Sequence, residues 1–216
     1  MKKLIAFDMD GVIFEHHNFW MELHKAFGTL EEGIELTKKY VKTDYDRLVQ
    51  EVIGRLWKDK PAKLYFDLIA SHKYVDGAKE TFDGLKRLGH ATMLITSGPY
   101  DLALRAKNEL GIDYIFANRL PIENGRVIGT SEMGYWKIRD DRKVEPLEEI
   151  RTTLGLNGKS VVAVVHDKND IKLAKHVKSM NGEVIGFMFE PHPEVEENCT
   201  KIVRSTNLKD ILAYID

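Results

Sequence analysis

One stretch decides the fold prediction: Leu4-Ile5-Ala6-Phe7-Asp8-Met9-Asp10-Gly11-Val12. Its first four residues form a short apolar run, which is typical of a buried strand in a parallel sheet. Asp8 and Asp10 follow where such a strand leaves the sheet, and open α/β sheets bind ligands at that edge. Two neighbouring acids repel each other and are costly to desolvate, so folding alone gives no reason to pair them. Taken alone, the pair fits a turn at Asp10-Gly11 as well as it fits a functional site.

The composition narrows the class of protein. The chain has 216 residues, 43% of them hydrophobic and 31% charged, which suits an α/β core with a small insertion. Its 32 basic and 34 acidic residues are well mixed, so we expect neither nucleic acid nor a membrane as a partner. Cys199 is the single cysteine, which excludes an internal disulfide and fits a reducing compartment. Without a signal-peptide pattern or an apolar run of about 20 residues, we expect a cytoplasmic protein.

The order of the predicted elements indicates a doubly wound, mostly parallel sheet. Apolar runs predict further strands at 91–96, 114–117, 161–165, 183–189 and 201–203. Helical patterns lie between or after these strands, at about 76–88, 99–110, 146–154, 171–179 and 208–214. Residues 122–128, with Asn124-Gly125 at their centre, predict a β-hairpin. Strands that alternate with helices predict an α/β fold with a Rossmann-like core.

Residues 15–71 carry a different pattern. Apolar and aromatic residues recur there at helical spacing, and no strong strand pattern interrupts them. We therefore predict a cap of about four helices, inserted into a core made of residues 1–14 and 72–216. His17 and Trp20 begin this cap just after the acidic pair, where they could face a ligand; packing within the cap is the alternative for the aromatic side chains.

Two further predicted strands also end in polar clusters, and parallel strands bring all three clusters to one edge of the sheet. Ser97 and the backbone of Gly98 precede a helix, whose N-terminus favours an anion; a plain serine cap is the alternative. Asp167 and Asp170 follow the strand at 161–165. Four converging carboxylates call for a cation, and oxygen ligands favour magnesium or calcium.

Lys143 stands just before the helix predicted near Pro146. A cation at a helix N-terminus is mildly unfavourable, by roughly 0.3–1 kcal/mol when exposed. Local stability therefore gives no reason for a lysine at this position. A solvated charged loop, in the run Asp-Asp-Arg-Lys, is the alternative interpretation.

Together these motifs resemble those of the haloacid dehalogenase-like hydrolase superfamily. The run Asp8-Met9-Asp10-Gly11-Val12 is similar to its first motif, Asp-x-Asp-x-Thr/Val, and Ser97-Gly98 is similar to its second. Lys143 and the residues after it resemble the lysine motif of phosphoserine phosphatases, and Asn169-Asp170 resembles the end of the fourth motif. Residues 111–129 are also similar to phosphoserine phosphatases. The resemblance covers nearly the whole predicted core.

The resemblance implies a metal-dependent phosphatase that acts on a small phosphate ester. Asp8 would attack phosphorus and form an aspartyl-phosphate, and Asp10 would serve as the general acid and base. Ser97, Gly98 and Lys143 would bind the transferring phosphoryl group. Mg²⁺ would be held by Asp8, by the backbone carbonyl of Asp10 and by a third protein ligand.

The third metal ligand is where the sequence departs from the family pattern. Aligned on Lys143 and Asn169-Asp170, the expected aspartate falls on His166. Asp167 with a shifted loop, Asp170, and His166 itself are the alternatives, and His166 would favour manganese, zinc or another transition metal over magnesium. An impaired metal site is the remaining alternative. Pro99 also removes one backbone N–H donor from the phosphate-binding loop.

The substrate-recognition residues of phosphoserine phosphatases are not matched convincingly either. Their cap glutamate falls on His17, and their arginine falls near Val52 with Arg55 close by. Phosphoserine is therefore not the favoured substrate, and His17, Trp20 and Arg55 are the candidate substrate residues. Two other functions stay open: a phosphate-ligand binding or regulatory protein with weakened catalysis, and a phosphomutase-like phosphotransferase.

Overall fold

The computed structural model describes residues 2–15, 18–129, 138–139, 142–187 and 192–215. Its main sheet has six parallel strands in the order β3-β2-β1-β6-β7-β8. These strands are Leu4–Phe7 (β1), Ala91–Pro99 (β2), Tyr114–Asn118 (β3), Val161–Val165 (β6), Glu183–Phe187 (β7) and Lys201–Val203 (β8). The doubly wound α/β fold is therefore confirmed. β1 lies between β2 and β6, so the acidic pair after it stands at the middle of the sheet edge.

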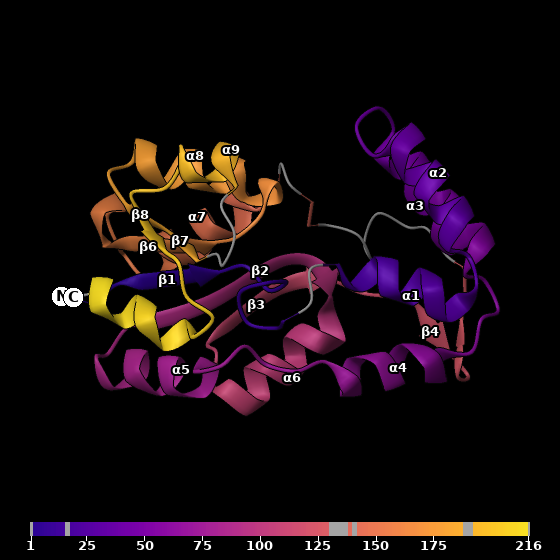
Figure 1. Ribbon diagram of the computed structural model, residues 1–216, viewed down its shortest axis with the longest axis horizontal. Coiled ribbons are helices and arrows are strands. Elements are labelled where there is room, and N and C mark those ends of the chain that lie inside the picture. The colour runs from indigo at the N-terminus through magenta and orange to yellow at the C-terminus, as the bar shows by residue number, and fades with distance from the viewer. Residues whose placement is uncertain (1, 16–17, 130–137, 140–141, 188–191, 216) are drawn as a thin grey trace.

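Helices cover both faces of this sheet (Figure 1). One face carries Ala78–Arg87 (α5), Tyr100–Leu110 (α6) and the 3₁₀ segment Leu208–Tyr214 (η4). The other carries Val144–Thr153 (α7), Ile171–Ser179 (α8) and Pro193–Glu196 (α9). Alternation along β1 separates the two layers: Ile5 and Phe7 belong to one buried cluster, and Leu4 and Ala6 to the other. The 3₁₀ turns Gly158–Ser160 (η2) and Lys168–Asp170 (η3) flank β6.

In the described part of the chain, four α-helices lie between β1 and α5, within the segment for which the sequence analysis proposes a cap. They are Phe19–Phe27 (α1), Leu30–Tyr40 (α2), Tyr45–Glu51 (α3) and Ala62–Ser71 (α4), and a π-helical turn, Val52–Leu56 (η1), continues α3. Asn18 begins α1 by accepting the Met21 N–H, and Gly28 ends it with a φ of 70°. Trp57 is fully buried among α1 residues, with its ring centroid 5.8 Å from Phe27 and 4.7 Å from His24. This aromatic cluster is the centre of the cap.

The predicted hairpin is also present, as Ile122–Glu123 (β4) and Arg126–Val127 (β5). It is hydrogen bonded to the cap: the Ala62 N–H donates to Gly125 O, and the Val127 N–H donates to Lys60 O. The Asp59 N–H returns a bond to Val127 O. A segment that the sequence assigns to the core is thus fastened to the cap insertion.

β2 and the helix nearest the C-terminus both differ from the sequence prediction. β2 runs on to Pro99 instead of ending at residue 96, because a register irregularity after Ile95 lets Pro99 pair with Asn118. The last helix is 3₁₀ rather than α. Among the residues described, no helix is long and apolar enough to cross a membrane.

Candidate active site

Asp8, Lys143 and Asp170 form a buried ion-pair triad. The Lys143 ammonium donates to Asp8 Oδ1 at 2.8 Å and to Asp170 Oδ1 at 2.7 Å. The three side chains come from the ends of β1 and η3 and from the N-cap of α7, and each is at most 8% exposed. Local helix stability gives no reason for a lysine at position 143. The reason is the pairing of its ammonium with the carboxylates of Asp8 and Asp170.

The loop after β1 is folded tightly so that the two acids leave the sheet together. The N–H groups of Val12, Ile13 and Phe14 all donate to Met9 O, and Gly11 turns the chain with a φ of 75°. A Cβ on Gly11 would stand 2.4 Å from Cδ2 of His166, so only glycine allows the end of β6 to approach this closely.

Asp170 organises the loop after β6. Its Oδ2 accepts the N–H groups of His166 at 3.1 Å and Asp167 at 3.3 Å, while its Oδ1 accepts from Lys143. Both carboxylate oxygens are thus already engaged by protein donors. This arrangement makes Asp170 a group that orients Lys143 and the loop, and it argues against Asp170 as a direct metal ligand.

The surroundings of Asp8 and Asp10 raise the pKa of both carboxyl groups. Burial and the charge of Asp170 raise the pKa of Asp8 to about 6, against the opposing effect of Lys143. Burial and the charge of Asp8 raise the pKa of Asp10 to about 7. Burial opposes the charge on Lys143, but the carboxylates of Asp170 and Asp8 outweigh it and raise the pKa of the ammonium. Lys143 is therefore a permanent cation beside two acids that are poised near neutral pH.

A small hollow, here called the acidic cleft, opens over these groups with a volume of about 70 Å³. It is lined by Asp8, Asp10, Asn18, Trp20, Thr96, Ser97, Lys143, Asp167 and Asn169. The structure thus brings together six of the candidates named from the sequence: Asp8, Asp10, Trp20, Ser97, Lys143 and Asp167.

Gly98 and Arg55 are not among the residues that line the acidic cleft. The Gly98 N–H donates to Thr96 Oγ1 at 2.8 Å, so it is engaged within its own loop, and a Cβ on Gly98 would lie 2.5 Å from Met9 Cε. Arg55 is exposed on the outside of the cap and binds Glu51 and Glu32, so its position does not support a contact with substrate. His17 lies outside the described residues.

His166 is not among the residues that line the acidic cleft. Its Nδ1 lies 3.1 Å from Phe187 O, at the end of β7, and its ring packs against Gly11. Of the three alternatives for the third metal ligand, Asp167 is the one whose side chain lines the cleft together with Asp8 and Asp10.

Asn118 is a site residue that the sequence analysis missed. This fully buried amide donates to Ser97 O at 2.9 Å and to Ile138 O at 2.7 Å, and it accepts the Ile138 N–H. It therefore ties the Ser97 loop to the segment that leads to Lys143. Trp20 Nε1 also donates to Ser97 O, at 2.8 Å. The signal was available, because Asn118 ends β3 at the same edge of the sheet as the other polar clusters.

The donor set fits a hard divalent cation in its chemistry. Asp10 Oδ1 is buried and has no hydrogen-bond partner among the described residues, and the cleft presents carboxylate oxygen rather than sulfur or imidazole. Within those same residues, however, no three acidic, histidine or cysteine side chains stand close enough to form a ready-made metal cluster. The carboxylates suited to a cation are present but are not yet gathered around one point.

Comparison with known proteins agrees with this fold and site. A family model described as haloacid dehalogenase-like hydrolase matches residues 2–178. A phosphoserine phosphatase of Methanocaldococcus jannaschii is 31% identical over 217 residues, which cover 99% of this chain and 98% of that protein. One of Archaeoglobus fulgidus is 34% identical over 171 residues, covering 78% of this chain and 48% of that protein.

The solved structures lead to the same family. A phospho-aspartyl intermediate analogue of phosphoserine phosphatase matches with a TM-score of 0.81 at 28% identity, covering 100% of this chain and 99% of that one. A substrate-bound phosphoserine phosphatase complex matches equally well, with the same TM-score, identity and coverage. An α/β fold with a buried Asp–Lys–Asp triad at its sheet edge defines the class, and the chain belongs to the haloacid dehalogenase-like hydrolase family.

Proposed function

We propose that this protein is a metal-dependent phosphatase that hydrolyses a small phosphate monoester through an aspartyl-phosphate on Asp8. The observation that carries the proposal is the buried Asp8–Lys143–Asp170 triad beneath a cleft that also presents Asp10. The similarity to phosphoserine phosphatases over the whole chain supports it. We place its action in the cytoplasm, which the single, half-buried Cys199 favours.

The first half of the reaction makes the covalent intermediate. The Asp8 oxygen that Lys143 does not bind attacks phosphorus, and the bond from phosphorus to the ester oxygen breaks. Asp10 gives its proton to the departing alkoxide, which leaves as the alcohol. Burial and the charge of Asp8 raise the pKa of Asp10, which favours the protonated form that this step needs.

The second half regenerates the enzyme. Asp10, now a carboxylate, takes a proton from water as that water attacks the phosphorus of the aspartyl-phosphate. The bond between Asp8 and phosphorus breaks, inorganic phosphate leaves, and Asp10 is protonated again. Lys143 keeps its charge throughout, so it orients Asp8 and offsets negative charge on the phosphoryl oxygens. The Ser97 hydroxyl, in the loop held by Asn118, is the neutral donor we assign to those oxygens.

Asp8, the backbone carbonyl of Asp10 and Asp167 are the groups we expect to hold Mg²⁺, since all three residues line the acidic cleft. Such an ion supplies Lewis-acid stabilisation of the charge on phosphate and nucleophile. Manganese is the alternative metal, and higher activity with manganese than with magnesium in a hydrolysis assay would identify it.

The test is hydrolysis of phenyl phosphate with magnesium, manganese or zinc, compared with a chelator and with Asp8→Asn. We expect metal-dependent release of phosphate and a loss of about 10³-fold or more in kcat for Asp8→Asn. Binding of the ester without turnover in any metal would favour a phosphate-binding protein instead. Phosphate transfer only when an acceptor sugar is present would favour a phosphotransferase.

A further inference from the structure

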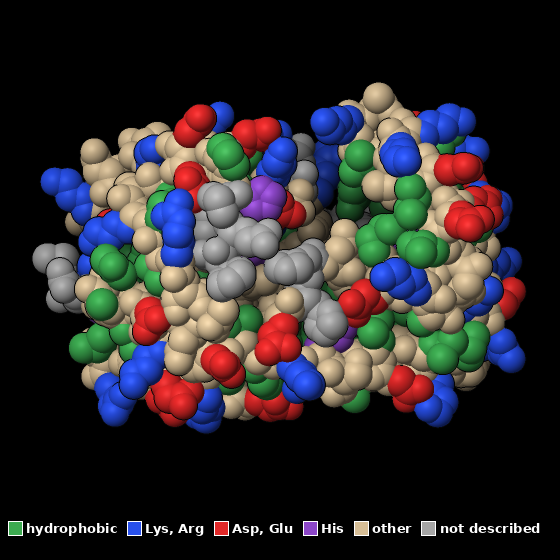
Figure 2. Space-filling view, viewed as in Figure 1, with side chains coloured by type: hydrophobic (Ala, Val, Ile, Leu, Met, Phe, Trp, Pro, Cys, Tyr) green, Lys and Arg blue, Asp and Glu red, His purple; other side chains and the backbone are tan. Residues whose placement is uncertain are grey.

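A second hollow, here called the cap chamber, continues from the acidic cleft into the cap. Its volume is about 350 Å³, near the lower end for small-molecule sites. It shares Asn18, Trp20, Ser97, Asp167 and Asn169 with the acidic cleft, so a phosphate held there would direct its alcohol into the chamber. Figure 2 shows a notch that divides the surface of the molecule into two lobes.

Apolar and aromatic side chains make up one part of the lining of the cap chamber, among them Trp20, Val41, Leu48, Val49, Val52 and Trp57. Polar side chains make up the rest, among them Asn18, His24 and Thr37. The rings of Trp20 and Trp57 lie 5.8 Å apart at an interplanar angle of 31°. The indole N–H of Trp20 donates to Ser97 O, and that of Trp57 lies 3.2 Å from His24 Nδ1, so both polar atoms are directed at protein acceptors.

Charge is nearly absent from these walls. Among the described residues that line the cap chamber, none is lysine or arginine, and Asp167 at the junction with the acidic cleft is the single acid. His24 also lines the chamber, and burial lowers its pKa to about 4, so its ring is neutral at physiological pH. Arg55, the nearest arginine in the sequence to Val52, faces Glu51 and Glu32 on the outside.

Resting on the phosphatase function proposed above, we propose that the cap chamber selects the phosphate ester of a primary alcohol bearing an uncharged, ring-sized apolar group. An amino-acid phosphate brings a carboxylate and an ammonium into the same space. Among the described residues that line the chamber, the carboxylate would meet no cation in exchange for its lost water, and it would face Asp167. An apolar ring loses no hydrogen bonds on entry and gains burial against the partly exposed indole of Trp20.

The test compares three esters of aliphatic primary alcohols: 2-phenylethyl phosphate, ethyl phosphate and O-phosphoserine. None is an activated aryl ester, so differences in kcat/KM report recognition more than leaving-group reactivity. We expect kcat/KM for 2-phenylethyl phosphate to exceed that for O-phosphoserine by about tenfold or more, which is the discrimination available to an apolar pocket. Equal or better use of O-phosphoserine overturns the inference and leaves the phosphatase function standing.

Substitutions in the wall of the cap chamber distinguish a loss of substrate selectivity from a general loss of activity. Trp20→Ala should reduce the preference for 2-phenylethyl over ethyl phosphate about tenfold, and Trp20→Phe should restore most of it. Because Trp20 also binds Ser97 O, the ratio of the two esters is the readout, not either rate alone. The matched control is Phe66→Ala, an aromatic of α4 that is 47% exposed and does not line the chamber; it should keep the wild-type ratio. An unchanged ratio in Trp20→Ala contradicts the inference.

If the protein hydrolyses none of the three esters, their binding affinities test the inference instead. Calorimetric titration of Asp8→Asn with the same three esters should give the tightest dissociation constant for 2-phenylethyl phosphate. No turnover of any ester by the wild-type protein would reject the phosphatase function, while this order of affinities would still support the apolar chamber. Tightest binding of O-phosphoserine would reject the chamber inference alone.

Discussion

Among single residues, we expect Lys143 to contribute strongly to stability, because its ammonium lies between two buried carboxylates. Its ammonium is 2.8 Å from Asp8 and 2.7 Å from Asp170, and its side chain is 1% exposed. Lys143→Met leaves both carboxylates buried without their cation, and breaking a buried pair in this way costs about 3–5 kcal/mol. We expect a loss of that size in the free energy of unfolding, measured by denaturant titration, together with loss of hydrolysis.

A second substitution separates the two roles of Lys143. Lys143→Met combined with Asp170→Asn removes one of the two buried carboxylates that the single variant leaves without a cation, so we expect part of the stability to return. Activity should not return, because the cation beside the phosphoryl group is still missing. A double variant that recovers both would show that Lys143 serves stability alone.

Asp167 and His166 are neighbours in sequence, but only Asp167 lines the acidic cleft, so a variant of each is the control for the other. Asp167 lines the acidic cleft, and His166 packs on Gly11 with Nδ1 near Phe187 O. We expect Asp167→Asn to raise the magnesium concentration for half-maximal activity about 10–100-fold, a range typical for loss of a group that supports a metal site. His166→Asn should change it less than threefold. The reverse order would assign the metal to His166.

At the scale of elements, α1 is held in the cap by a neutral histidine. His24 is 3% exposed, its Nδ1 lies 3.2 Å from Trp57 Nε1 and 2.8 Å from Thr29 Oγ1, and α2 packs Gly33 against its ring. A proton on Nδ1 would point at the indole N–H and break that hydrogen bond. Burial accordingly lowers the pKa of His24 from 6.5 to about 4.

The stability of the protein should therefore depend on pH through His24. Because its pKa is lower in the folded than in the unfolded chain, the unfolded chain takes up the proton first as pH falls below 6.5. The stabilisation is complete above pH 6.5 and is lost progressively towards pH 4, by about 3 kcal/mol at ~1.4 kcal/mol per pK unit. Denaturant titrations of wild type and His24→Gln at pH 7 and pH 4.5 measure it. A parallel loss in both proteins would assign the pH dependence to other groups.

Elements whose role follows from local pattern could be predicted from the sequence, and those whose role follows from packing could not. Apolar runs ending in Asp8, Ser97 and the 166–170 cluster specify parallel strands and one shared edge. The π-helical turn η1 is different, because the Trp57 N–H bonds to Val52 O, five residues back. This wider turn leaves Val52 facing the cap chamber while Arg55 points outward, which counting along an ordinary helix does not anticipate.

Hydrogen bonds between segments that are distant in sequence could not be predicted from the sequence either. Asn118 joins Ser97 to Ile138 across 21 and 20 residues of sequence, and Gly98 turns its N–H to Thr96 instead of leaving it for an anion. The hairpin at 122–127 has a clear turn signal, yet nothing in it reveals that its partner is the cap. Such contacts depend on how whole elements pack, and a single sequence encodes that only weakly.

At the scale of the whole molecule, positive charge gathers where cap and core meet. A hollow of about 590 Å³, here called the basic cleft, lies between α2–α3 and η3–α8 and adjoins the cap chamber through Val41, Tyr45 and Asn169. Its described lining includes Lys42, Arg139, Lys168, Lys172 and Lys175 and no acid. Figure 2 shows lysine and arginine side chains around the notch between the two lobes. The whole chain has a net charge of -2, so the positive charge of the basic cleft is a local feature and not a property of the entire surface.

The basic cleft should draw the anionic ester towards the active site. Reversing Lys172 and Lys175 of α8 to Glu should lower kcat/KM about tenfold at low salt, because a field of one sign concentrates a substrate of the opposite sign. Neither side chain lines the acidic cleft, so kcat should stay unchanged. At 1 M salt the Debye length shrinks to about 3 Å, and the difference from wild type should nearly vanish.

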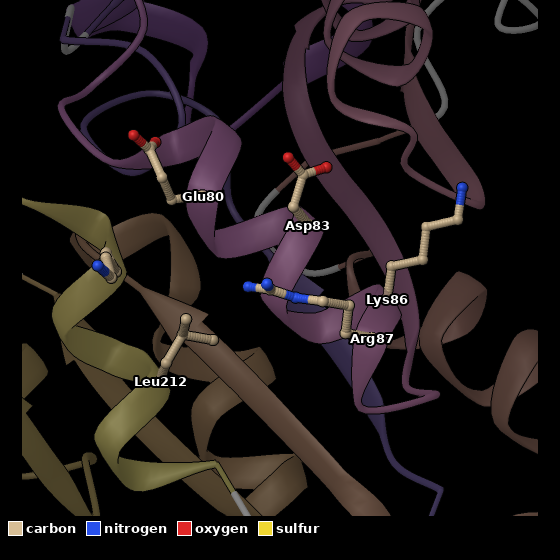
Figure 3. Close-up of a pocket in the computed structure, with 6 residues that line it drawn as sticks. Glu80, Asp83, Lys86, Arg87 and Leu212 are labelled. Atoms are coloured by element: carbon tan, nitrogen blue, oxygen red, sulfur yellow. The ribbon is translucent and has the colours of Figure 1, made fainter.

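A matched double variant tests whether the effect is local. Lys86→Glu with Arg87→Glu makes the same change in net charge in the hollow between α5 and η4, where Glu80 and Asp83 mix both signs of charge (Figure 3). This hollow shares no lining residue with the basic cleft, the cap chamber or the acidic cleft. We expect the α5 pair to leave kcat/KM within about twofold of wild type at every salt concentration, because screening confines a surface charge to its own neighbourhood. Equal losses in the two variants would mean that the substrate responds to overall charge, and the basic cleft would then have no role in its approach.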